Sequence, residues 1–287
     1  MVAPRRKVEI YSMKFKINKT ILNVFEAGVG NYNELRPTLI FLHYFGGSSC
    51  AWTEVIEKLK DNYHCVAPDL RGFGSSDAFT ENYALKDYAD DVADLISRLT
   101  IENFVLIGHS MGGKIALAFA AGNPKGLKSL ILLAPSPPTP EPIPETEREK
   151  LLNNHGNRCV ATETICKAAE GKLSGEVFER AINDNLRSSK TAWRAWLETG
   201  SREDISAEIG RINVPVLVAA GEKDENITAK LLTREIVQRI ENVNLIVVPS
   251  VKHLLPLEAP VEIANLIREY CGNRADYEEK LAGNSEK

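Results

Sequence analysis

The chain has 287 residues, enough for one large α/β domain or two small ones. Basic and acidic residues nearly balance, with 35 Lys and Arg against 39 Asp and Glu, and no basic cluster alternates with aromatic residues. We therefore expect neither a nucleic-acid partner nor a membrane-surface partner. Segment 1–15 is positively charged without a following apolar run, and no segment is long enough to span a membrane, which predicts a cytoplasmic protein.

The cysteines and glycines of the chain form no metal or cofactor motif. The five cysteines form no CxxC pair, which fits reduced packing residues better than disulfides or zinc ligands. Gly28-Val29-Gly30 is followed by Asn33 where a dinucleotide fingerprint has its third glycine, so we interpret it as a turn between early strands. We expect no metal and no cofactor.

Strand patterns recur along most of the chain. The first thirty residues predict antiparallel edge strands over Val8–Tyr11, Met13–Ile17 and Thr20–Phe25. Apolar runs of strand length then follow at 38–42, 65–68, 104–107, 129–133, 216–220 and 245–248. Helical patterns separate most of these runs, and such alternation implies a parallel sheet. We predict an α/β fold with a mixed, mostly parallel central sheet and helices on both faces.

The clearest helix covers 84–99, where apolar residues recur at helical spacing. Its opposite side carries four aspartates that we expect to face water, namely Asp87, Asp90, Asp91 and Asp94. This helix should cover one face of the sheet.

The strand and helix rhythm breaks at the proline-rich segment 135–144. From there to 207 only helices are predicted, at about 145–154, 160–171, 174–186 and 190–199. We predict a core domain formed by 1–136 and 208–287, and a helical cap (lid) over 137–207. Such a lid would cross the C-terminal edge of the sheet, where open α/β sheets hold their ligands, and would bound a pocket. The polar C-terminus from Gly272 is predicted to fray.

A glycine-flanked serine lies between a strand and a helix, in Gly108-His109-Ser110-Met111-Gly112-Gly113. A serine at so tight a turn is forced toward positive φ, and Gly108 and Gly112 leave room for the neighbouring backbones. Its hydroxyl lies at a helix N-terminus, where free N–H groups favour an oxyanion. A helix N-cap is the structural alternative, and the preceding strand favours the nucleophile.

A nucleophilic serine needs a base, normally an imidazole held by a carboxylate. Of the five histidines, His253 alone follows the last strand in a loop at the C-terminal edge, where helix capping is its alternative role. Asp224, after the preceding strand, is the preferred acid; its rivals Glu222 and Glu225 are otherwise read as solvated loop charges. The order Ser110, Asp224, His253 is nucleophile, acid, base.

With these motifs the chain resembles the α/β-hydrolase superfamily, from about residue 10 to 271. The Gly-His-Ser-Met-Gly-Gly elbow and the segment from His253 to Pro260 are most similar to the small cofactor-free haloperoxidase-like esterases, a carboxylesterase group. The resemblance implies an α/β-hydrolase fold with an inserted lid and a Ser110, His253 and Asp224 catalytic triad. Dehalogenases and epoxide hydrolases of the superfamily carry an aspartate at the elbow, so Ser110 argues against both.

Two further segments resemble parts of this family. His43-Tyr-Phe-Gly-Gly47 is similar to its oxyanion segment, which implies an oxyanion hole formed by the backbone N–H groups of Phe45 and Met111. Residues 67–76 resemble its Asp-x-Arg-Gly-x-Gly-x-Ser loop, which we interpret as a structural connection with a buried Asp69–Arg71 pair.

Two residues depart from the family pattern. Tyr44 replaces a glycine of the oxyanion segment, which puts the local backbone angle in doubt and places a ring near the pocket. Lys252 replaces a glycine before the base, and a nearby ammonium would lower the pKa of His253.

The sequence says less about the substrate. The candidate pocket residues are Tyr44, Trp193, Trp196 and Leu254, although the two tryptophans are read first as packing residues of the lid. We predict a serine hydrolase that cleaves a small carboxylic ester or lactone through an acyl-enzyme. Perhydrolysis, carbon–carbon bond hydrolysis and a lid-gated receptor that retains the triad remain alternatives; the oligomeric state is not predicted.

Overall fold

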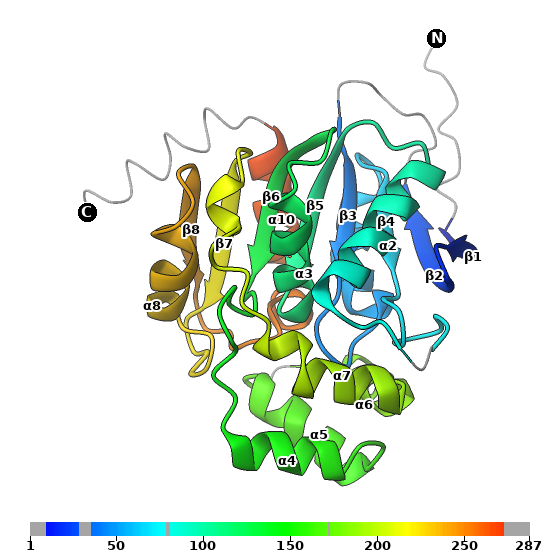
Figure 1. Ribbon diagram of the computed structural model, residues 1–287, viewed down its shortest axis with the longest axis vertical. Helices are drawn as coiled ribbons and strands as arrows, with labels where there is room; N and C mark the ends of the chain where they lie inside the picture. Colours follow the sequence, from blue (N-terminus) through cyan, green and yellow to red (C-terminus); the bar gives the residue numbers. More distant parts are fainter. Residues whose placement is uncertain (1–9, 29–35, 79–80, 172, 273–287) are drawn as a thin grey trace.

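An eight-stranded sheet runs through the molecule (Figure 1), in a computed structural model that describes residues 10–28, 36–78, 81–171 and 173–272. The strands are β1 (Ile10–Ile17), β2 (Thr20–Ala27), β3 (Thr38–Leu42), β4 (Cys65–Pro68), β5 (Phe104–His109), β6 (Leu127–Leu133), β7 (Val216–Gly221) and β8 (Val243–Val248). Their order is β1-β2-β4-β3-β5-β6-β7-β8, with β1 antiparallel to β2 and β2 antiparallel to β4. All other neighbours are parallel, which confirms the predicted mostly parallel sheet.

The antiparallel edge differs from the prediction in one respect. β1 is a single strand, whereas the sequence predicted two strands interrupted at Ser12. Ser12 pairs in register with Phe25, and its hydroxyl donates to Asn23 Oδ1 at 2.7 Å. The polar side chain is satisfied across the strand pair, so it does not end the strand. Residues 1–9, 29–35 and 273–287, on which the rest of the first strand, most of the glycine turn and the frayed end were predicted, lie outside the described residues.

Helices cover both faces of the sheet. They are α1 (Thr53–Leu59), α2 (Leu85–Arg98), α3 (Met111–Ala120), α8 (Ala229–Leu232), α9 (Leu255–Glu258) and α10 (Pro260–Gly272). α2 and α3 lie together in front of the sheet in Figure 1, and α1 packs with α10 behind it. Because β3, β5 and β7 are covered on both faces, every residue in them is buried, which explains their unbroken apolar runs.

Two predicted charge positions are wrong. Asp91, expected to face water, is buried, and its carboxylate accepts two hydrogen bonds of 2.6 Å from the Arg71 guanidinium. Arg71 therefore does not pair with Asp69, whose carboxylate instead accepts the N–H groups of Ser49 and Ser75. Helical spacing predicts which residues of α2 are apolar and face the sheet. It does not predict that Arg71, from a separate loop, pairs with Asp91.

Four helices separate β6 from β7: α4 (Glu145–Asn153), α5 (Arg158–Ala168), α6 (Gly175–Arg187) and α7 (Lys190–Glu198). We call residues 137–207 the helical insertion. The side chains of Asn157, Ser174 and Ser189 cap α5, α6 and α7, which explains where these helices begin. The four helices lie together at one end of the sheet (Figure 1).

Ionic and polar contacts fasten the helical insertion to the sheet domain. The Arg180 guanidinium of α6 contacts both carboxylate oxygens of Glu54 in α1, at 2.6 and 2.7 Å. The buried Asp184, also in α6, accepts a 2.6 Å hydrogen bond from Ser48, beside the segment predicted to bind an oxyanion. These contacts fix the position of the helical insertion relative to that segment.

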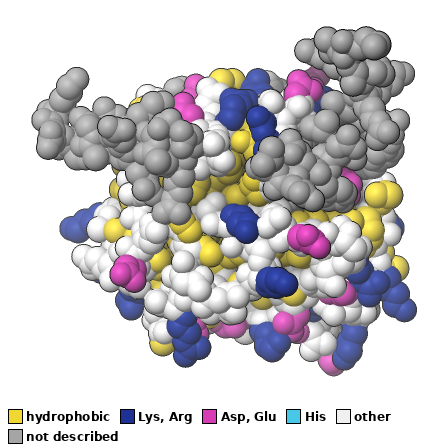
Figure 2. All heavy atoms as spheres, turned by 90° about the horizontal axis from the view of Figure 1, so that it is seen from above, with side chains coloured by type: hydrophobic (Ala, Val, Ile, Leu, Met, Phe, Trp, Pro, Cys, Tyr) yellow, Lys and Arg dark blue, Asp and Glu magenta, His cyan; other side chains and the backbone are white. Residues whose placement is uncertain are grey.

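Figure 2 shows the end of the molecule opposite the helical insertion. Seen from that end, basic side chains are scattered among acidic and uncharged ones (Figure 2). Within the described ranges, no helix has the length and apolar character needed to cross a membrane.

Candidate active site

Ser110 occupies the turn between β5 and α3 with φ 52° and ψ −115°. The flanking glycines are required by close backbone contacts. A Cβ atom on Gly108 would lie 2.4 Å from the Gly112 carbonyl oxygen, and one on Gly112 would lie 2.3 Å from the Leu42 carbonyl oxygen. Only glycine fits at either position, so the strand and the helix approach closely enough to project the serine from the sheet edge.

Main-chain hydrogen bonds hold Ser110 in this uncommon conformation. Its N–H donates to the Leu133 carbonyl at 3.1 Å, and its carbonyl accepts the N–H of Ser136 at 2.9 Å. Both partners lie at the end of β6 or just after it. A non-glycine residue at positive φ costs about 1–3 kcal/mol, and these bonds offset part of that cost.

The His253 imidazole lies between the other two predicted residues. Its Nε2 is 2.9 Å from the Ser110 hydroxyl oxygen, and its Nδ1 is 2.7 Å from Asp224 Oδ2. With a proton on Nδ1, the imidazole donates to the carboxylate and accepts from the serine hydroxyl. The fold therefore brings together Ser110, His253 and Asp224, which are far apart in the chain.

Asp224 is the carboxylate that reaches the imidazole among the three acid candidates. Its Oδ1 accepts the N–H groups of Asn226 and Ile227 at 3.0 Å each, which leaves Oδ2 directed at His253. Glu222 and Glu225 are exposed, and Glu222 accepts the N–H of Ser250 instead. Burial raises the pKa of Asp224, but the hydrogen bond and charge of His253 and the two N–H groups outweigh it, so the pKa lies below its usual value.

The pKa of His253 is shifted in the opposite direction to the one predicted from Lys252. Burial lowers this pKa, but the hydrogen bond and negative charge of Asp224 outweigh burial and hold it above its usual value. The Lys252 ammonium lies 3.8 Å from the Glu170 carboxylate, which balances its charge. The expected lowering of the His253 pKa is therefore wrong.

The four remaining histidines have hydrogen-bonding roles outside this chain of three residues. The buried His43 accepts the Leu70 N–H at Nε2 and binds the Tyr44 carbonyl at Nδ1. His64 lies beside Glu26, and His155 binds the Ser188 carbonyl. His109 binds the His253 carbonyl.

A tight turn carries the predicted oxyanion segment. The Gly47 N–H donates to the Tyr44 carbonyl at 3.0 Å, and Gly46 has φ +77°, which suits the third position of such a turn. The left-handed residue is thus Gly46, so Tyr44 needs no unusual backbone angle. No loop carbonyl among the described residues accepts the Phe45 N–H, and Met111 begins α3, so its N–H has no partner within the helix.

The Tyr44 side chain is buried in place of the usual glycine. Its ring lies 5.3 Å from the His109 ring, centroid to centroid. A Cβ atom on Gly47 would lie only 2.9 Å from the Tyr44 ring. Tyr44 thus fills space between the oxyanion segment and the elbow.

The other candidate pocket residues are packed rather than exposed. Trp193 and Trp196 are 4% and 2% exposed, and the Trp193 indole N–H donates to the Leu151 carbonyl at 3.0 Å. The Phe45 ring lies 4.2 Å from the Trp193 ring and 6.3 Å from the Trp196 ring. These contacts place the two tryptophans over the oxyanion segment. Leu254 is also buried.

Two residues beside the site were missed by the sequence analysis. Lys114 is fully buried in α3, and its ammonium donates to the carbonyls of Thr139 and Ser201, at the two ends of the helical insertion. Glu258 accepts the N–H groups on either side of His253. The sequence did carry a signal for each residue. Lys114 interrupts the apolar run after the elbow, and Glu258 is an acid five residues after the base.

Among residues 10–28, 36–78, 81–171 and 173–272, no three His, Cys, Asp or Glu side chains are placed to hold a metal ion. The described site itself offers a hydroxyl, an imidazole and a carboxylate.

The chain is similar to several known proteins. A family model described as the alpha/beta hydrolase fold matches residues 37–158. The chain is 27% identical over 264 residues to 2-(acetamidomethylene)succinate hydrolase of Mesorhizobium japonicum, covering 87% of this chain and 91% of the relative. It is 29% identical over 248 residues to Lipase 3 of a Moraxella species, covering 82% and 77%. An esterase structure from Exiguobacterium antarcticum superposes with a TM-score of 0.83 at 19% identity, covering 92% and 100%.

The fold and these similarities define a hydrolase of the α/β fold. The family model, the relatives and the solved structures support a member of the α/β-hydrolase superfamily.

Proposed function

We propose that the protein is a serine hydrolase that cleaves a carboxylic ester or lactone through Ser110, His253 and Asp224. The observation that carries this proposal is the hydrogen-bonded series from the Ser110 hydroxyl through the His253 imidazole to the Asp224 carboxylate. A base within hydrogen-bond reach of a nucleophile, itself oriented by a third group, is the arrangement that activates serine.

The reaction follows from these contacts. The Ser110 oxygen attacks the substrate carbonyl while His253 Nε2 takes the hydroxyl proton, and Asp224 stabilises the resulting imidazolium. His253 then donates this proton to the leaving alcohol, which leaves Ser110 acylated. Water, deprotonated by His253, attacks the acyl carbonyl and releases the acid and free Ser110.

The negative oxygen of each tetrahedral intermediate requires hydrogen-bond donors. The N–H groups of Phe45 and Met111 are the proposed donors, supported by their places in the Tyr44–Gly47 turn and at the start of α3. The turn is held by His43, whose two ring nitrogens bind the main chain at Tyr44 and Leu70. Donors fixed in this way need not reorganise as charge develops.

The helical insertion is proposed to act as a lid over this site, with 1–136 and 208–287 as the core domain. Support comes from the contact of Trp193 with Phe45 and from the Asp184–Ser48 hydrogen bond. The insertion would bound the substrate pocket, with Tyr44, Trp193, Trp196 and Leu254 as its proposed lining. Within the superfamily, the protein is proposed to belong to the haloperoxidase-like esterase group.

A fluorophosphonate label and a substrate panel test the proposal together. We expect covalent labelling of Ser110 and sustained turnover of a p-nitrophenyl ester or a lactone, with both lost in Ser110→Ala. Preferential cleavage of a β-diketone would indicate carbon–carbon bond hydrolysis, and peracid formation from acetate and peroxide would indicate perhydrolysis. Labelling with only a single burst, together with ligand-dependent melting shifts, would indicate a receptor and contradict the hydrolase.

A further inference from the structure

The main chain around His253 is held from three directions. The His253 N–H donates to the Ala168 carbonyl at 3.0 Å, at the end of α5 in the helical insertion. The His253 carbonyl lies 2.7 Å from His109 Nε2, in the elbow. Burial lowers the pKa of His109 to about 3, so its ring is neutral and its Nε2 carries the proton that this bond requires.

The third direction is the carboxylate of Glu258, the last residue of α9. Its Oε1 accepts the Leu254 N–H at 3.1 Å and the Lys252 N–H at 3.2 Å, which are the two residues that flank His253. Its Oε2 accepts the Glu170 N–H at 2.8 Å. One carboxylate thus joins both sides of the base to the segment that follows α5.

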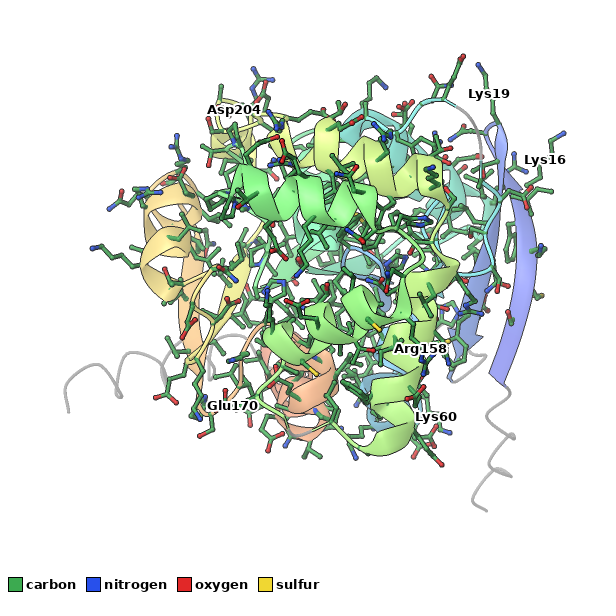
Figure 3. The ribbon with its side chains drawn as sticks, turned by 90° about the horizontal axis from the view of Figure 1, so that it is seen from below. Lys16, Lys19, Lys60, Arg158, Glu170 and Asp204 are labelled. Atoms are coloured by element: carbon green, nitrogen blue, oxygen red, sulfur yellow. The ribbon has the colours of Figure 1, made fainter. Side chains whose placement is uncertain are left out.

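Glu170 adds a second link between the same parts of the molecule. Its carboxylate contacts the ammonium of Lys223 at 2.7 Å and that of Lys252 at 3.8 Å. These lysines are the neighbours of Asp224 and His253 in the chain. Glu170 lies at the edge of the helical insertion, beside the segment that carries α9 and α10 (Figure 3).

We propose that Glu258 is a positioning residue for His253, which holds the base in line with Ser110 and Asp224 and fastens its loop to the helical insertion at Glu170. The proposal rests on the proposed function in that it assigns His253 as the base. Three N–H donors converge on two oxygen atoms, an arrangement that an ionised carboxylate satisfies and an amide does not.

The Glu258→Gln substitution tests whether the hydrogen bonds of this carboxylate, and not only the volume of its side chain, hold His253 in place. Glutamine keeps the shape of the side chain but has only one accepting oxygen, so either the flanking N–H groups or the Glu170 N–H loses its acceptor. It also removes a negative charge. The negative charges of Asp224, Glu141 and Glu258 raise the pKa of His253 and so favour its imidazolium, and the neutral His109 binds its carbonyl.

The experiment compares wild type, Glu258→Gln, Glu258→Asp and the control Glu222→Gln. Glu222 is a matched control because its carboxylate accepts one N–H, that of Ser250, from the same loop. For Glu258→Gln we expect kcat to fall by about tenfold to a hundredfold with KM changed by less than about twofold, because small displacements of a catalytic group have effects of this size. The acid limb of its kcat/KM profile should move to lower pH.

Glu258→Asp keeps the charge but shortens the reach. We expect its acid limb to stay near that of wild type while kcat falls, and we expect the Glu222→Gln control to match wild type in both. If Glu258→Gln fails to fold, the aspartate variant still decides whether kcat depends on the reach of this carboxylate. A variant that only lowers the melting temperature, with kcat per folded molecule and the acid limb unchanged, would overturn the proposal.

Titration of the His253 ring by NMR separates this proposal from the proposed function. The ring signals report the pKa and the Asp224 bond without any turnover. If Ser110→Ala stays active, the proposed function fails, and the His253 titration in Glu258→Gln still tests the positioning role. An unchanged titration and an unchanged Nδ1–H signal in Glu258→Gln would contradict it.

Discussion

The Nδ1 atom of His253 lies 2.7 Å from Asp224 Oδ2, and this bond sets the pH range in which the imidazole is neutral. The pKa of His253 is held above its usual 6.5, mainly by Asp224 acting against burial. Because only the neutral ring accepts the serine proton, we expect kcat/KM to fall as the pH drops, with an apparent pKa above 6.5. A pH–rate profile on a neutral ester measures it.

Asp224→Asn serves as the control for that profile. The substitution removes the negative charge that favours the imidazolium, so the residual acid limb should move to lower pH, and kcat should fall by roughly 10⁴-fold because the amide disfavours the required tautomer. If the acid limb of the Asp224→Asn profile stays at the wild-type pH, a group other than His253 causes it.

The Ser110 hydroxyl, 2.9 Å from His253 Nε2, is expected to be essential for turnover. Ser110→Ala should lower kcat by roughly 10⁶-fold, since loss of a triad nucleophile has effects of that order. The fold should persist. Alanine has the same backbone strain as serine at this positive φ, so the melting temperature should stay close to that of wild type. Retention of most of the esterase rate would refute the assignment of the nucleophile.

The buried Arg71–Asp91 pair should contribute far more to stability than an exposed pair on the same helix. Asp91→Asn leaves the Arg71 charge poorly compensated in the interior, so we expect a loss of about 3–5 kcal/mol in the free energy of unfolding. Asp90→Asn, which breaks the exposed Lys86–Asp90 pair, should cost less than about 1 kcal/mol. Urea denaturation measures both, and equal costs would contradict this difference.

Lys114 should make stability depend on pH in the alkaline range. Burial lowers its pKa from 10.5 to about 8, so between these values the unfolded chain binds more protons than the native protein. Stability therefore rises with pH across this window, by up to about 3 kcal/mol. Relative to Lys114→Met, wild type should gain this amount between pH 7 and pH 10.5 in urea denaturation.

The exposed Lys128 offers a control for that comparison. In Lys128→Met the difference from wild type should stay constant with pH, because this side chain is exposed in the native protein. A constant difference for Lys114→Met as well would mean that Lys114 titrates normally in the native protein.

Tyr44 and Gly47 should be energetically coupled. Gly47→Ala places a Cβ atom 2.9 Å from the Tyr44 ring, so we expect it to cost about 1–3 kcal/mol in wild type. In a Tyr44→Gly background this contact is gone, and the cost should fall by at least about 1 kcal/mol. The remote Gly122→Ala should cost the same in both backgrounds, and additivity at Gly47 would disprove the contact.

The sequence by itself determined the local structure. Apolar runs and turn residues predicted β3, β5 and the four helices of the insertion closely, because hydrophobic period and capping chemistry act over a few neighbouring residues. The tight turn at Ser110 was also readable, since its two glycines are demanded by adjacent backbone.

Only the tertiary structure decided which distant groups meet. From the sequence, Asp91 was predicted to be a solvated helix residue. Its partner Arg71 lies in a separate loop that packs against the helix only in the folded protein. Likewise Glu258 and Glu170 carry no periodic signal, and the hydrogen bond between them joins residues that are 88 apart in the chain. Hydrogen bonds and ion pairs depend on distances in space of a few ångströms, which spacing along the chain does not encode.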